Sequence, residues 1–352
     1  MTSVRLEHLG KRYGRTIALD DVNFQIEPGE LFFLLGPSGC GKSTLLRLIA
    51  GLDAPSNGRV YFGDRDVTAL PTQRRNAVMC FQSYALWPHM TVRQNILFGL
   101  RARNLPTEQQ DQRIAEVLRL VQLQDYTARK PNALSGGQQQ RTALARALAV
   151  HPDCLLLDEP LSNIDARLRL EMRTEIRRIC KSAGFTTIYV THDQKEALSI
   201  ADRIALLRDG KVVQIGTPGE LYFKPRTSFV ADFLAQANLL SGEVIGRDAA
   251  TIQVKTALGT LSAVIRDGQP PSHVVLSIRP QQMRIVGDRS PVTGSNRIAG
   301  KVVESAFLGE TSEHVLSVNG QHLRVVSSPP MITAPTELTV EFDAADALVL
   351  AE

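Results

Sequence analysis

The stretch GPSGCGKST, residues 36–44, has the residue types and spacing of a loop that binds nucleotide phosphates. It fits the pattern GxxxxGK[ST], and it lies between a short apolar run and a helix-forming segment, as that pattern requires. Its glycines let the backbone curl until amide groups face an anion, and the helix start adds a positive partial charge. We expect Lys42 to reach the β- and γ-phosphates and Ser43 to ligate Mg²⁺. The predicted phosphate loop consists of Gly36, Pro37, Ser38, Gly39, Cys40, Gly41, Lys42, Ser43 and Thr44.

The run CLLLDE places two carboxylates directly after an apolar segment that is typical of a buried strand. Asp158, at the end of such a strand, can hold Mg²⁺ directly or through water. Glu159 follows it and can polarise the water that attacks the γ-phosphate. Glu159 could also be an ordinary surface acid, but its position beside a phosphate loop favours a role in ATP hydrolysis.

A second glycine-rich turn, LSGGQQQR at residues 134–141, precedes the helix-forming run TALARALAV. Ser135 and the amide groups of Gly136 and Gly137 predict another anion site at a helix start. A domain that binds one ATP has no evident use for two phosphate-binding turns.

The elements around these motifs alternate between strands and helices from residue 31 to about 205. Apolar runs such as LFFLLG and TTIYV indicate strands buried on both faces, so we predict an α/β core with a mostly parallel sheet. The first 30 residues indicate short strands, and RIALLRDGKVVQIG indicates a hairpin that turns at Asp209 and Gly210. In the helix-forming segment 105–123, Thr107 and Gln110 have the spacing of a capping box.

The chain changes character near residue 238. From there on, short strands separated by Gly and Pro dominate, which predicts a small β-barrel domain or a pair of barrels. A length of 352 residues also suits two domains better than one. We therefore expect a nucleotide-binding domain at 1–237, with a helical subdomain at about 85–150, and an all-β domain at 238–352.

Together, GPSGCGKST, LSGGQ, CLLLDEP and YVTHD resemble the motifs of the ATP-binding cassette (ABC) ATPases, in the family's order and spacing. The resemblance runs through the whole first domain. It implies an α/β P-loop NTPase with an N-terminal antiparallel β part and a helical subdomain, and it implies ATP and Mg²⁺ as ligands. LSIRPQQMRIV and VVESAFLGETSEHVLSVNG resemble the transport-associated OB-like domain of importer ATPases.

The resemblance also implies roles for single residues. Tyr13 is similar to the aromatic residue that stacks on adenine, the alternative being an exposed strand tyrosine. Gln82 resembles the Q-loop glutamine, which contacts Mg²⁺ and the attacking water. His192 resembles the switch histidine that touches the γ-phosphate. Asp165 resembles the D-loop aspartate that communicates across a dimer, although this chain has Ile164 where the family usually has Leu.

The family likeness gives the second glycine turn a ligand. In ABC ATPases the LSGGQ signature covers the ATP held by the P-loop of the other subunit. Ser135, Gly136, Gly137 and Gln138 would therefore complete a partner's site rather than their own. Because this chain has one P-loop and one signature, we expect a head-to-tail homodimer that closes on ATP and is released by hydrolysis.

Composition fits an ordinary globular protein, with 43% hydrophobic and 22% charged residues. No apolar run approaches the roughly 20 residues of a membrane helix, and we find no N-terminal signal region, so we expect a cytoplasmic chain that meets the membrane through partners. The net charge divides into +7 for residues 1–238 and −3 for residues 239–352. A basic first domain suits a polyphosphate, an acidic partner, a membrane-proximal position or nucleic acid, or it simply has a solvated basic surface.

The four cysteines give no metal signal, because none lies at CxxC spacing. Cys40 differs from the others in lying inside the phosphate loop, where a helix start can activate a thiol. We hypothesise that oxidation or alkylation of Cys40 blocks nucleotide binding.

Three roles compete within the family: the motor of an importer, a soluble ATPase of DNA repair or translation, and the motor of an exporter. The stretch after Gln82, SYALWPHMTVRQNILFGL, carries Tyr84, Leu86, Trp87 and Met90. These residues either pack inside the helical subdomain or form a docking surface, and Trp is favoured in interfaces. In importers this region receives a helix of the transmembrane subunit.

The C-terminal residues favour the importer. They are net acidic, and Phe307 and Phe342 are the only aromatic residues in 239–352, which argues against nucleic acid as a partner. Neither heptad arms nor a second cassette occur, as repair ATPases would have, and no membrane helices occur, as exporters often have.

The sequence therefore predicts a peripheral ATPase subunit on the cytoplasmic face of the inner (plasma) membrane. It would act with two transmembrane permease subunits and, indirectly, a substrate-binding protein. FQSYALWPHM, DEPLSNIDA and the ANLL junction resemble the importer branch for iron(III), polyamines and phosphonates, and a sugar importer is the alternative.

Overall fold

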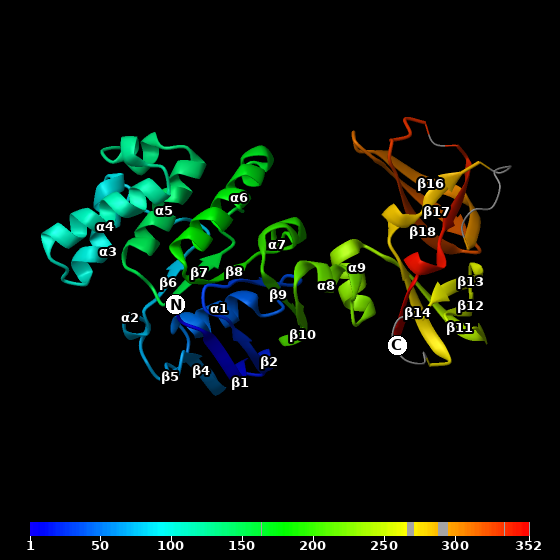
Figure 1. The fold of residues 1–352 in the computed structure, drawn as a ribbon, viewed down its shortest axis with the longest axis horizontal. Coiled ribbons are helices and arrows are strands. Elements are labelled where there is room, and N and C mark those ends of the chain that lie inside the picture. Colours follow the sequence, from blue (N-terminus) through cyan, green and yellow to red (C-terminus); the bar gives the residue numbers. More distant parts are fainter. Residues whose placement is uncertain (163, 266–270, 288–294, 334, 352) are drawn as a thin grey trace. The chain divides into compact units, whose positions relative to one another are not determined.

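The chain divides into two compact units, Met1–Gly219 and Glu220–Glu352, each with its own hydrophobic core (Figure 1). In the part of the chain that is described, no helix is long and apolar enough to cross a membrane. The computed structural model describes residues 1–162, 164–265, 271–287, 295–333 and 335–351.

A six-stranded sheet forms the centre of the first unit. Its strands, in order across the sheet, are β10 (Lys211–Gly216), β9 (Arg203–Arg208), β3 (Leu31–Leu35), β8 (Thr186–Val190), β7 (Cys154–Asp158) and β6 (Ala77–Cys80). β10 pairs antiparallel with β9, and the pairs from β9 to β6 are parallel. All five residues of β3 are buried, as the apolar run predicts. The prediction of an α/β core with a mostly parallel sheet is confirmed.

The hairpin between β9 and β10 turns at Asp209 and Gly210, as predicted. Both residues have positive φ, 49° and 78°, which is the conformation that a tight hairpin turn of this kind requires. The Gly210 N–H donates to the Cys40 carbonyl oxygen at 3.2 Å, so this turn also supports the phosphate loop.

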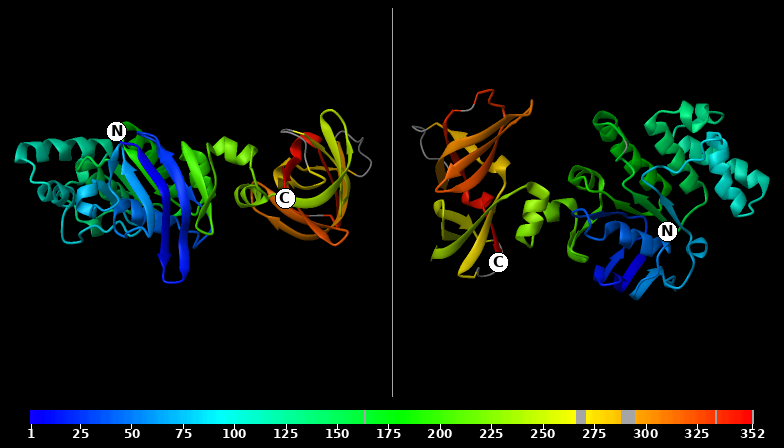
Figure 2. Two further views of the ribbon diagram at one scale, coloured as in Figure 1. Left: turned by 90° about the horizontal axis from the view of Figure 1, so that it is seen from below. Right: turned by 180° about the vertical axis from the view of Figure 1, so that it is seen from behind.

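A smaller antiparallel sheet includes a long N-terminal hairpin (Figure 2). Its strands, in order, are β2 (Thr16–Ile26), β1 (Val4–Tyr13), β4 (Asn57–Phe62) and β5 (Arg65–Asp66). Helix α1 (Lys42–Ala50) packs against both sheets, and its leucines share one core with residues from each. Helices α6 (Ala166–Ala183) and α7 (Gln194–Ile200) pack together and against β3.

The helical part of the first unit packs α5 against α3, α4 and α6. Its elements are α2 (Thr72–Arg75), α3 (Val92–Ala102), α4 (Thr107–Leu120), η1 (Gln124–Tyr126), η2 (Pro131–Ala133) and α5 (Gly136–Ala149). The capping box predicted at Thr107 is wrong. Pro106 takes the N-cap position, Thr107 is the first helical residue, and the Gln110 side chain donates to the Leu105 carbonyl oxygen. Pro106 is already extended, with ψ of 147°, which starts the helix one residue earlier than a capping threonine would.

Two short helices come next, α8 (Pro218–Phe223), within which the second unit begins at Glu220, and α9 (Ser228–Ala235). Two five-stranded antiparallel sheets follow and share one core, which confirms the prediction of an all-β C-terminal fold. The first sheet is β13 (Gly259–Val264), β12 (Thr251–Thr256), β11 (Asn238–Arg247), β14 (His273–Ile278) and β20 (Leu348–Ala351). The second is β15 (Arg284–Val286), β19 (Glu337–Phe342), β16 (Asn296–Phe307), β17 (Ser312–Val318) and β18 (Gln321–Ser327), with the turns η3 (Pro280–Gln282) and η4 (Ala344–Asp346) between strands.

Candidate active site

The phosphate loop joins the end of β3 to the start of α1, as predicted. Close backbone contacts require glycine at two of its positions. A Cβ on Gly36, where φ is 153°, would lie 2.2 Å from the Leu207 oxygen, and a Cβ on Gly41, where φ is 105°, would lie 2.6 Å from the Ala18 oxygen. Neighbouring strands thus fix a loop that presents the first amide groups of α1 at the edge of the sheet.

Lys42 folds back over this loop and is only 7% exposed. Its Nζ donates to the carbonyl oxygens of Gly36 at 2.7 Å and Pro37 at 2.9 Å, and it lies 3.7 Å from the Cys40 Sγ. The ammonium group is therefore held at the phosphate loop by contacts that phosphate oxygens could replace. The Cys40 thiol is buried beside it, so modification of Cys40 requires the loop to open.

Ser43 and Asp158 meet across the sheet, since the Ser43 hydroxyl donates to Asp158 Oδ1 at 3.5 Å. Burial raises the pKa of Asp158, and the carboxylate of Glu159 raises it further. A hydroxyl and a partly desolvated carboxylate are oxygen ligands that Mg²⁺ prefers, and a bound cation would relieve the repulsion between the two acids. The two residues fit the predicted magnesium site.

Glu159 and His192 come together as a pair. Glu159 Oε1 lies 3.2 Å from His192 Nδ1, and the Glu159 side chain is less exposed (25%) than that of His192 (62%). Glu159 has a positive φ of 44°, and its N–H donates to the Val190 carbonyl oxygen at the end of β8. This bond ties the acid to the strand that leads to His192.

Gln82 follows β6, in an exposed turn at the same edge of the sheet. β6 pairs in parallel with β7, with Cys80 opposite Leu157, so both strands end at one level. The carboxyl ends of four neighbouring strands, β3, β8, β7 and β6, therefore carry the phosphate loop, His192, the two acids and Gln82. Residues far apart in the sequence meet here because parallel strands end at a common edge.

Tyr13 ends β1 and is 47% exposed. Its hydroxyl donates to Asp53 Oδ2 at 3.0 Å, and Arg47 of α1 holds the same carboxylate at 2.8 Å. Burial raises the pKa of Tyr13, with Asp53 adding to the shift. Lys11 Nζ lies 4.8 Å from the ring centroid. The ring is thus exposed and tethered beside the helix that begins at the phosphate loop.

The signature turn caps α5. Ser135 Oγ accepts the Gln138 N–H at 3.4 Å, and Gln138 Oε1 accepts the Ser135 N–H at 3.0 Å, which makes a capping box. A Cβ on Gly136 would meet nothing within 4 Å, whereas one on Gly137 would lie 3.4 Å from Leu168 of α6. Among the described residues, no hydrogen bond joins this turn to the phosphate loop.

Asp165 is the N-cap of α6, and its Oδ1 accepts the Leu168 N–H at 2.9 Å. This bond gives the side chain a structural role within the chain. Its predicted role between subunits stays a prediction.

The region proposed to dock on a partner is divided between surface and interior. Trp87 is 41% exposed and packs against Phe98, which is 48% exposed, with ring centroids 5.4 Å apart. Tyr84 is only 8% exposed, because its side chain lies beside Cys80 of β6 and Ala143 and Leu144 of α5, where Arg146 also holds the Tyr84 and Ala85 carbonyl oxygens. The expectation that Tyr84 contributes to the surface is therefore wrong, and Trp87 with Phe98 supplies the exposed apolar area.

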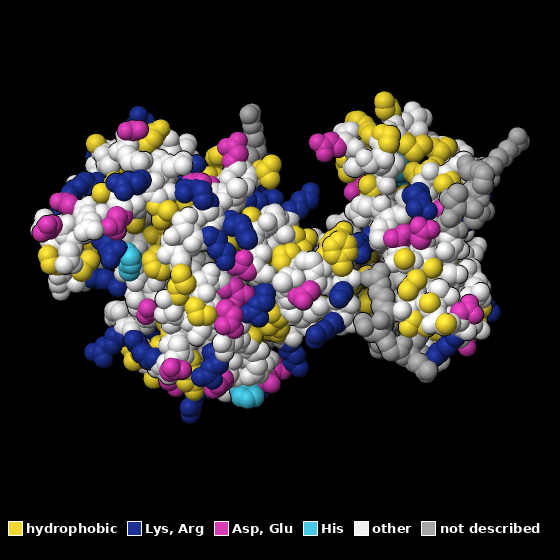
Figure 3. All heavy atoms as spheres, in the orientation of Figure 1, with side chains coloured by type: hydrophobic (Ala, Val, Ile, Leu, Met, Phe, Trp, Pro, Cys, Tyr) yellow, Lys and Arg dark blue, Asp and Glu magenta, His cyan; other side chains and the backbone are white. Residues whose placement is uncertain are grey.

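Surface charge shows no concentrated basic patch on the face seen in Figure 3. Lys and Arg side chains are spread over the first unit among Asp and Glu side chains. Of the interpretations given above for the net charge of the first domain, this distribution fits an ordinary solvated surface.

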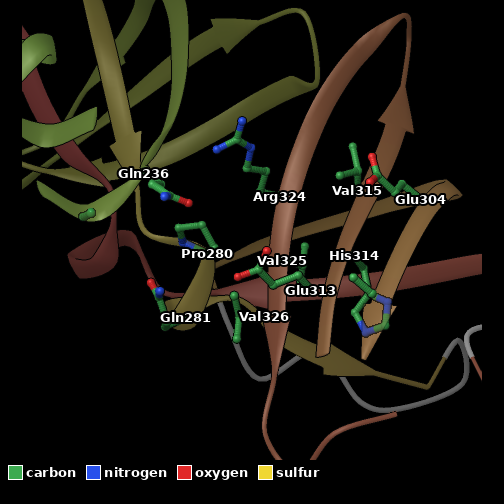
Figure 4. Close-up of a pocket in the computed structure, with 12 residues that line it drawn as sticks. Gln236, Pro280, Gln281, Glu304, Glu313, His314, Val315, Arg324, Val325 and Val326 are labelled. Atoms are coloured by element: carbon green, nitrogen blue, oxygen red, sulfur yellow. The ribbon is translucent and has the colours of Figure 1, made fainter. Parts of the chain in front are cut away.

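A cavity of about 330 Å³ lies in the second unit, between the strands β16 to β18, the turn η3 and the end of α9. Figure 4 shows Glu304, Glu313 and Arg324 around it. Two carboxylates and one guanidinium do not suit a polyphosphate, and none of the nucleotide motifs lies here.

Asp193, the residue after His192, has partners that sequence reasoning missed. Asp193 caps α7, and its Oδ2 accepts from Arg173 Nη2 at 2.9 Å. Its place before a helix, three residues ahead of Glu196, is an N-cap signal that could have been used. The contact with Arg173 on α6 depends on the tertiary fold and has no local signal.

Comparison with known proteins agrees with this geometry. Residues 19–162 match the ABC transporter family, and residues 276–350 match the TOBE domain. The chain is 45% identical over 311 residues to the Fe(3+) ions import ATP-binding protein FbpC of Rhizobium etli, covering 88% of this chain and 86% of that protein. It is 42% identical over 342 residues to the protein of the same name from Brucella abortus, covering 97% and 95%.

Among solved structures, the first unit resembles the ATP-binding cassette MJ0796, a dimer in a post-hydrolysis state bound to ADP and phosphate. The TM-score is 0.54 and the sequence identity 34%, over 61% of this chain and 98% of that one.

Proposed function

Because the chain belongs to the ABC transporter family, as the ATP-hydrolysing subunit of an importer, we propose that it powers the uptake of iron(III). The similar proteins from Rhizobium etli and Brucella abortus, both named as Fe(3+) importers, support this substrate. A sugar importer, the alternative from the sequence, has no such support. The chain itself holds no substrate site in this proposal, since selection of the metal rests with the membrane and binding-protein subunits.

The phosphate loop would hold ATP, and Tyr13 would stack on adenine. Lys42 would exchange the carbonyl oxygens of Gly36 and Pro37 for β- and γ-phosphate oxygens. Ser43, Asp158 and Gln82 would hold Mg²⁺, which neutralises phosphate charge when bound.

Glu159 would accept a proton from the attacking water as it approaches the γ-phosphate. Its carboxylate lies within reach of His192, whose imidazole would then contact the γ-phosphate and orient the acid. Gln82, from the neighbouring strand end, would hold the same water from the other side.

A homodimer would complete each site. Ser135 to Gln138 form a helix start that suits an anion, and within the described residues no hydrogen bond joins them to the chain's own phosphate loop, which supports their use on a partner's ATP. Asp165 would communicate across the same interface. The dimeric cassette MJ0796 supports the two-subunit assembly.

We place the dimer at the cytoplasmic face of the inner membrane, beneath two permease subunits. Trp87 and Phe98 would receive a permease helix, because large aromatic side chains with half-exposed faces anchor interfaces well. A substrate-binding protein outside would deliver the iron.

One observation carries the proposal: four neighbouring strand ends bring the phosphate loop, both acids, His192 and Gln82 to one edge, with Glu159 and His192 3.2 Å apart. The test replaces Glu159 with Gln in the complex with its permease in lipid vesicles. Glu159→Gln should bind ATP but lose hydrolysis by about 10²- to 10⁴-fold, the usual contribution of a general base. Uptake of radioactive iron(III) should stop with it, while the exposed-acid control Glu108→Gln retains both. Full ATP turnover in Glu159→Gln would refute the role of Glu159, and vesicles that take up a sugar but no iron would refute the substrate.

A further inference from the structure

Asp193, the residue directly after His192, is held on two sides. Its Oδ1 accepts the N–H groups of Lys195 at 2.8 Å and Glu196 at 3.2 Å, so it caps α7. Its Oδ2 accepts from Arg173 Nη2 at 2.9 Å and lies 3.9 Å from Arg169 Nη1. Its own N–H donates to Thr191 Oγ1 at 3.0 Å. The backbone on both sides of His192 is therefore fixed.

Both arginines belong to α6, the helix that starts in the D-loop. The Arg169 guanidinium also donates to the Ile164 carbonyl oxygen at 3.0 Å, one residue before the N-cap Asp165. Arg169 thus touches the D-loop and Asp193 at once. Arg173, one turn further along α6, makes the shorter contact with Asp193.

These contacts are largely withdrawn from solvent. The side chain of Arg173 is 12% exposed and that of Asp193 22%. A charge pair in such surroundings is stronger than one in water, and its geometry is restricted. Arg169 also lines a cavity of about 40 Å³ together with Glu159, His192 and Asp193, so this arginine lies beside the residues assigned to hydrolysis.

We propose that Arg173 and Arg169 are positioning residues that make the placement of His192 depend on the placement of the D-loop. Asp193 is the connection, since it is covalently next to His192 and paired with α6. The inference rests on the proposed role of His192 in hydrolysis. It adds that two arginines of α6 fix the backbone beside His192 and connect it to the D-loop within one chain.

The test is steady-state and single-turnover ATP hydrolysis by the purified full-length protein. In Arg173→Met, kcat should fall about 10- to 100-fold, because a small displacement of a reacting group has that effect, while KM for ATP changes by less than about twofold. Arg173→Lys keeps a positive charge and should recover most of the loss. The matched control is Arg177→Met, one turn further along α6. Arg177 pairs with Asp202 at 3.4 Å and donates to the Ile200 carbonyl oxygen, so its contacts lie at the C-terminal end of α7, away from His192. Arg177→Met should keep its kcat.

A double variant separates positioning from direct action. If Arg173 acts through His192, then adding Arg173→Met to His192→Ala should lower kcat no further. A further multiplicative loss would overturn the proposal, and so would an unchanged kcat in Arg173→Met alone. If Arg173→Met does not fold by circular dichroism, Asp193→Asn tests the same link, because its amide oxygen can still cap α7 while its charge is gone.

Failure of the proposed function gives a different result. Full activity in His192→Ala would overturn the assigned role of His192, and the proposed connection between α6 and His192 would fall with it. Loss of activity in His192→Ala with full activity in Arg173→Met and Asp193→Asn would overturn the link alone.

Discussion

Substitution of Ser135 tests whether the signature turn serves a partner's ATP. We expect Ser135→Ala to bind ATP as a monomer with unchanged affinity, because in the described part of the chain no hydrogen bond joins the signature turn to the phosphate loop. We expect its hydrolysis to be lost, because the hydroxyl and the α5 amide groups would face the γ-phosphate held by the other subunit.

The geometry of the α5 cap allows the effect of Ser135→Ala on stability to be compared with its effect on kcat. The hydrogen bond that Ser135→Ala removes is long, at 3.4 Å, and the other half of the capping box survives because Gln138 Oε1 accepts a backbone N–H. Loss of an N-cap costs about 1 kcal/mol, which lowers the melting temperature of a unit this size by about 2–4 °C. Loss of one hydrogen-bond donor to transition-state charge lowers kcat about 10²- to 10³-fold. The catalytic effect is therefore much larger than the folding effect.

Mixing two inactive variants gives the sharpest assay. Lys42→Ala removes the phosphate-binding ammonium and should be inactive by itself. In a heterodimer of Ser135→Ala with Lys42→Ala, one site combines an intact phosphate loop with an intact signature, provided that the two come from different chains. An equimolar mixture should therefore recover about a quarter of the wild-type rate, because half of the dimers carry one of two sites.

The alternative gives a clear contrary result. If each signature served the ATP of its own chain, both sites of the heterodimer would carry one defective half, and mixing would recover nothing. Absence of recovery in a mixture where differently tagged chains co-purify would refute the shared site. Gly136→Ala is a useful companion, since its Cβ would meet no atom within 4 Å, so a loss of hydrolysis would not come from a clash within the chain.

Three further outcomes are expected. Trp87→Ala should keep basal ATPase activity but lose iron uptake in vesicles with the permease, whereas the control Phe223→Ala, which changes another exposed aromatic residue, should keep both. Unchanged uptake in Trp87→Ala would contradict the docking surface. Arg75→Met should lower the free energy of unfolding by about 3–5 kcal/mol in urea denaturation, since the 2% exposed guanidinium donates to four backbone carbonyl oxygens, two of them in α1. A loss below about 1 kcal/mol would contradict this role. Burial lowers the pKa of His314 from 6.5, so the unfolded chain binds a proton first as the pH falls, and the second unit should lose stability below about pH 6.5. Amide exchange in β17 should therefore become faster as the pH falls, and His314→Gln should weaken this pH dependence. An equally steep profile in His314→Gln would contradict the prediction.

The sequence was informative where function rests on local pattern. The phosphate loop, the acids after β7 and the hairpin at Asp209 each combine a strand pattern with a turn or charge signal within about ten residues. Parallel pairing then brings the strand ends together, so the predicted residues meet without further information. Buried runs such as LFFLL sufficed to predict that pairing.

It was uninformative where a residue's environment is set by a distant contact. Tyr84 lies inside because it packs on α5, about 60 residues later in the chain, where Arg146 also binds its carbonyl oxygen. The partner of Asp193 lies 20 residues earlier, on a helix face that is rich in arginine and gives no hint of which one pairs. The capping box at Thr107 failed for a smaller reason, since Pro106 can begin a helix without a side-chain cap.

These distant contacts meet on one helix. α6 begins at the D-loop and holds the residue after His192 through Arg173. It also lies beside the signature turn, since a Cβ added to Gly137 would lie within 4 Å of Leu168 and Met172. In the proposed dimer, movement of α5 when a partner's phosphate binds its signature would displace the same helix that holds Asp193. Because packed helices shift as units rather than bend continuously, a change at the signature can reach His192 by a single rigid element. A chain that completes its neighbour's site would thus adjust its own, which is a physical route by which the two ATP sites of a dimer could act together.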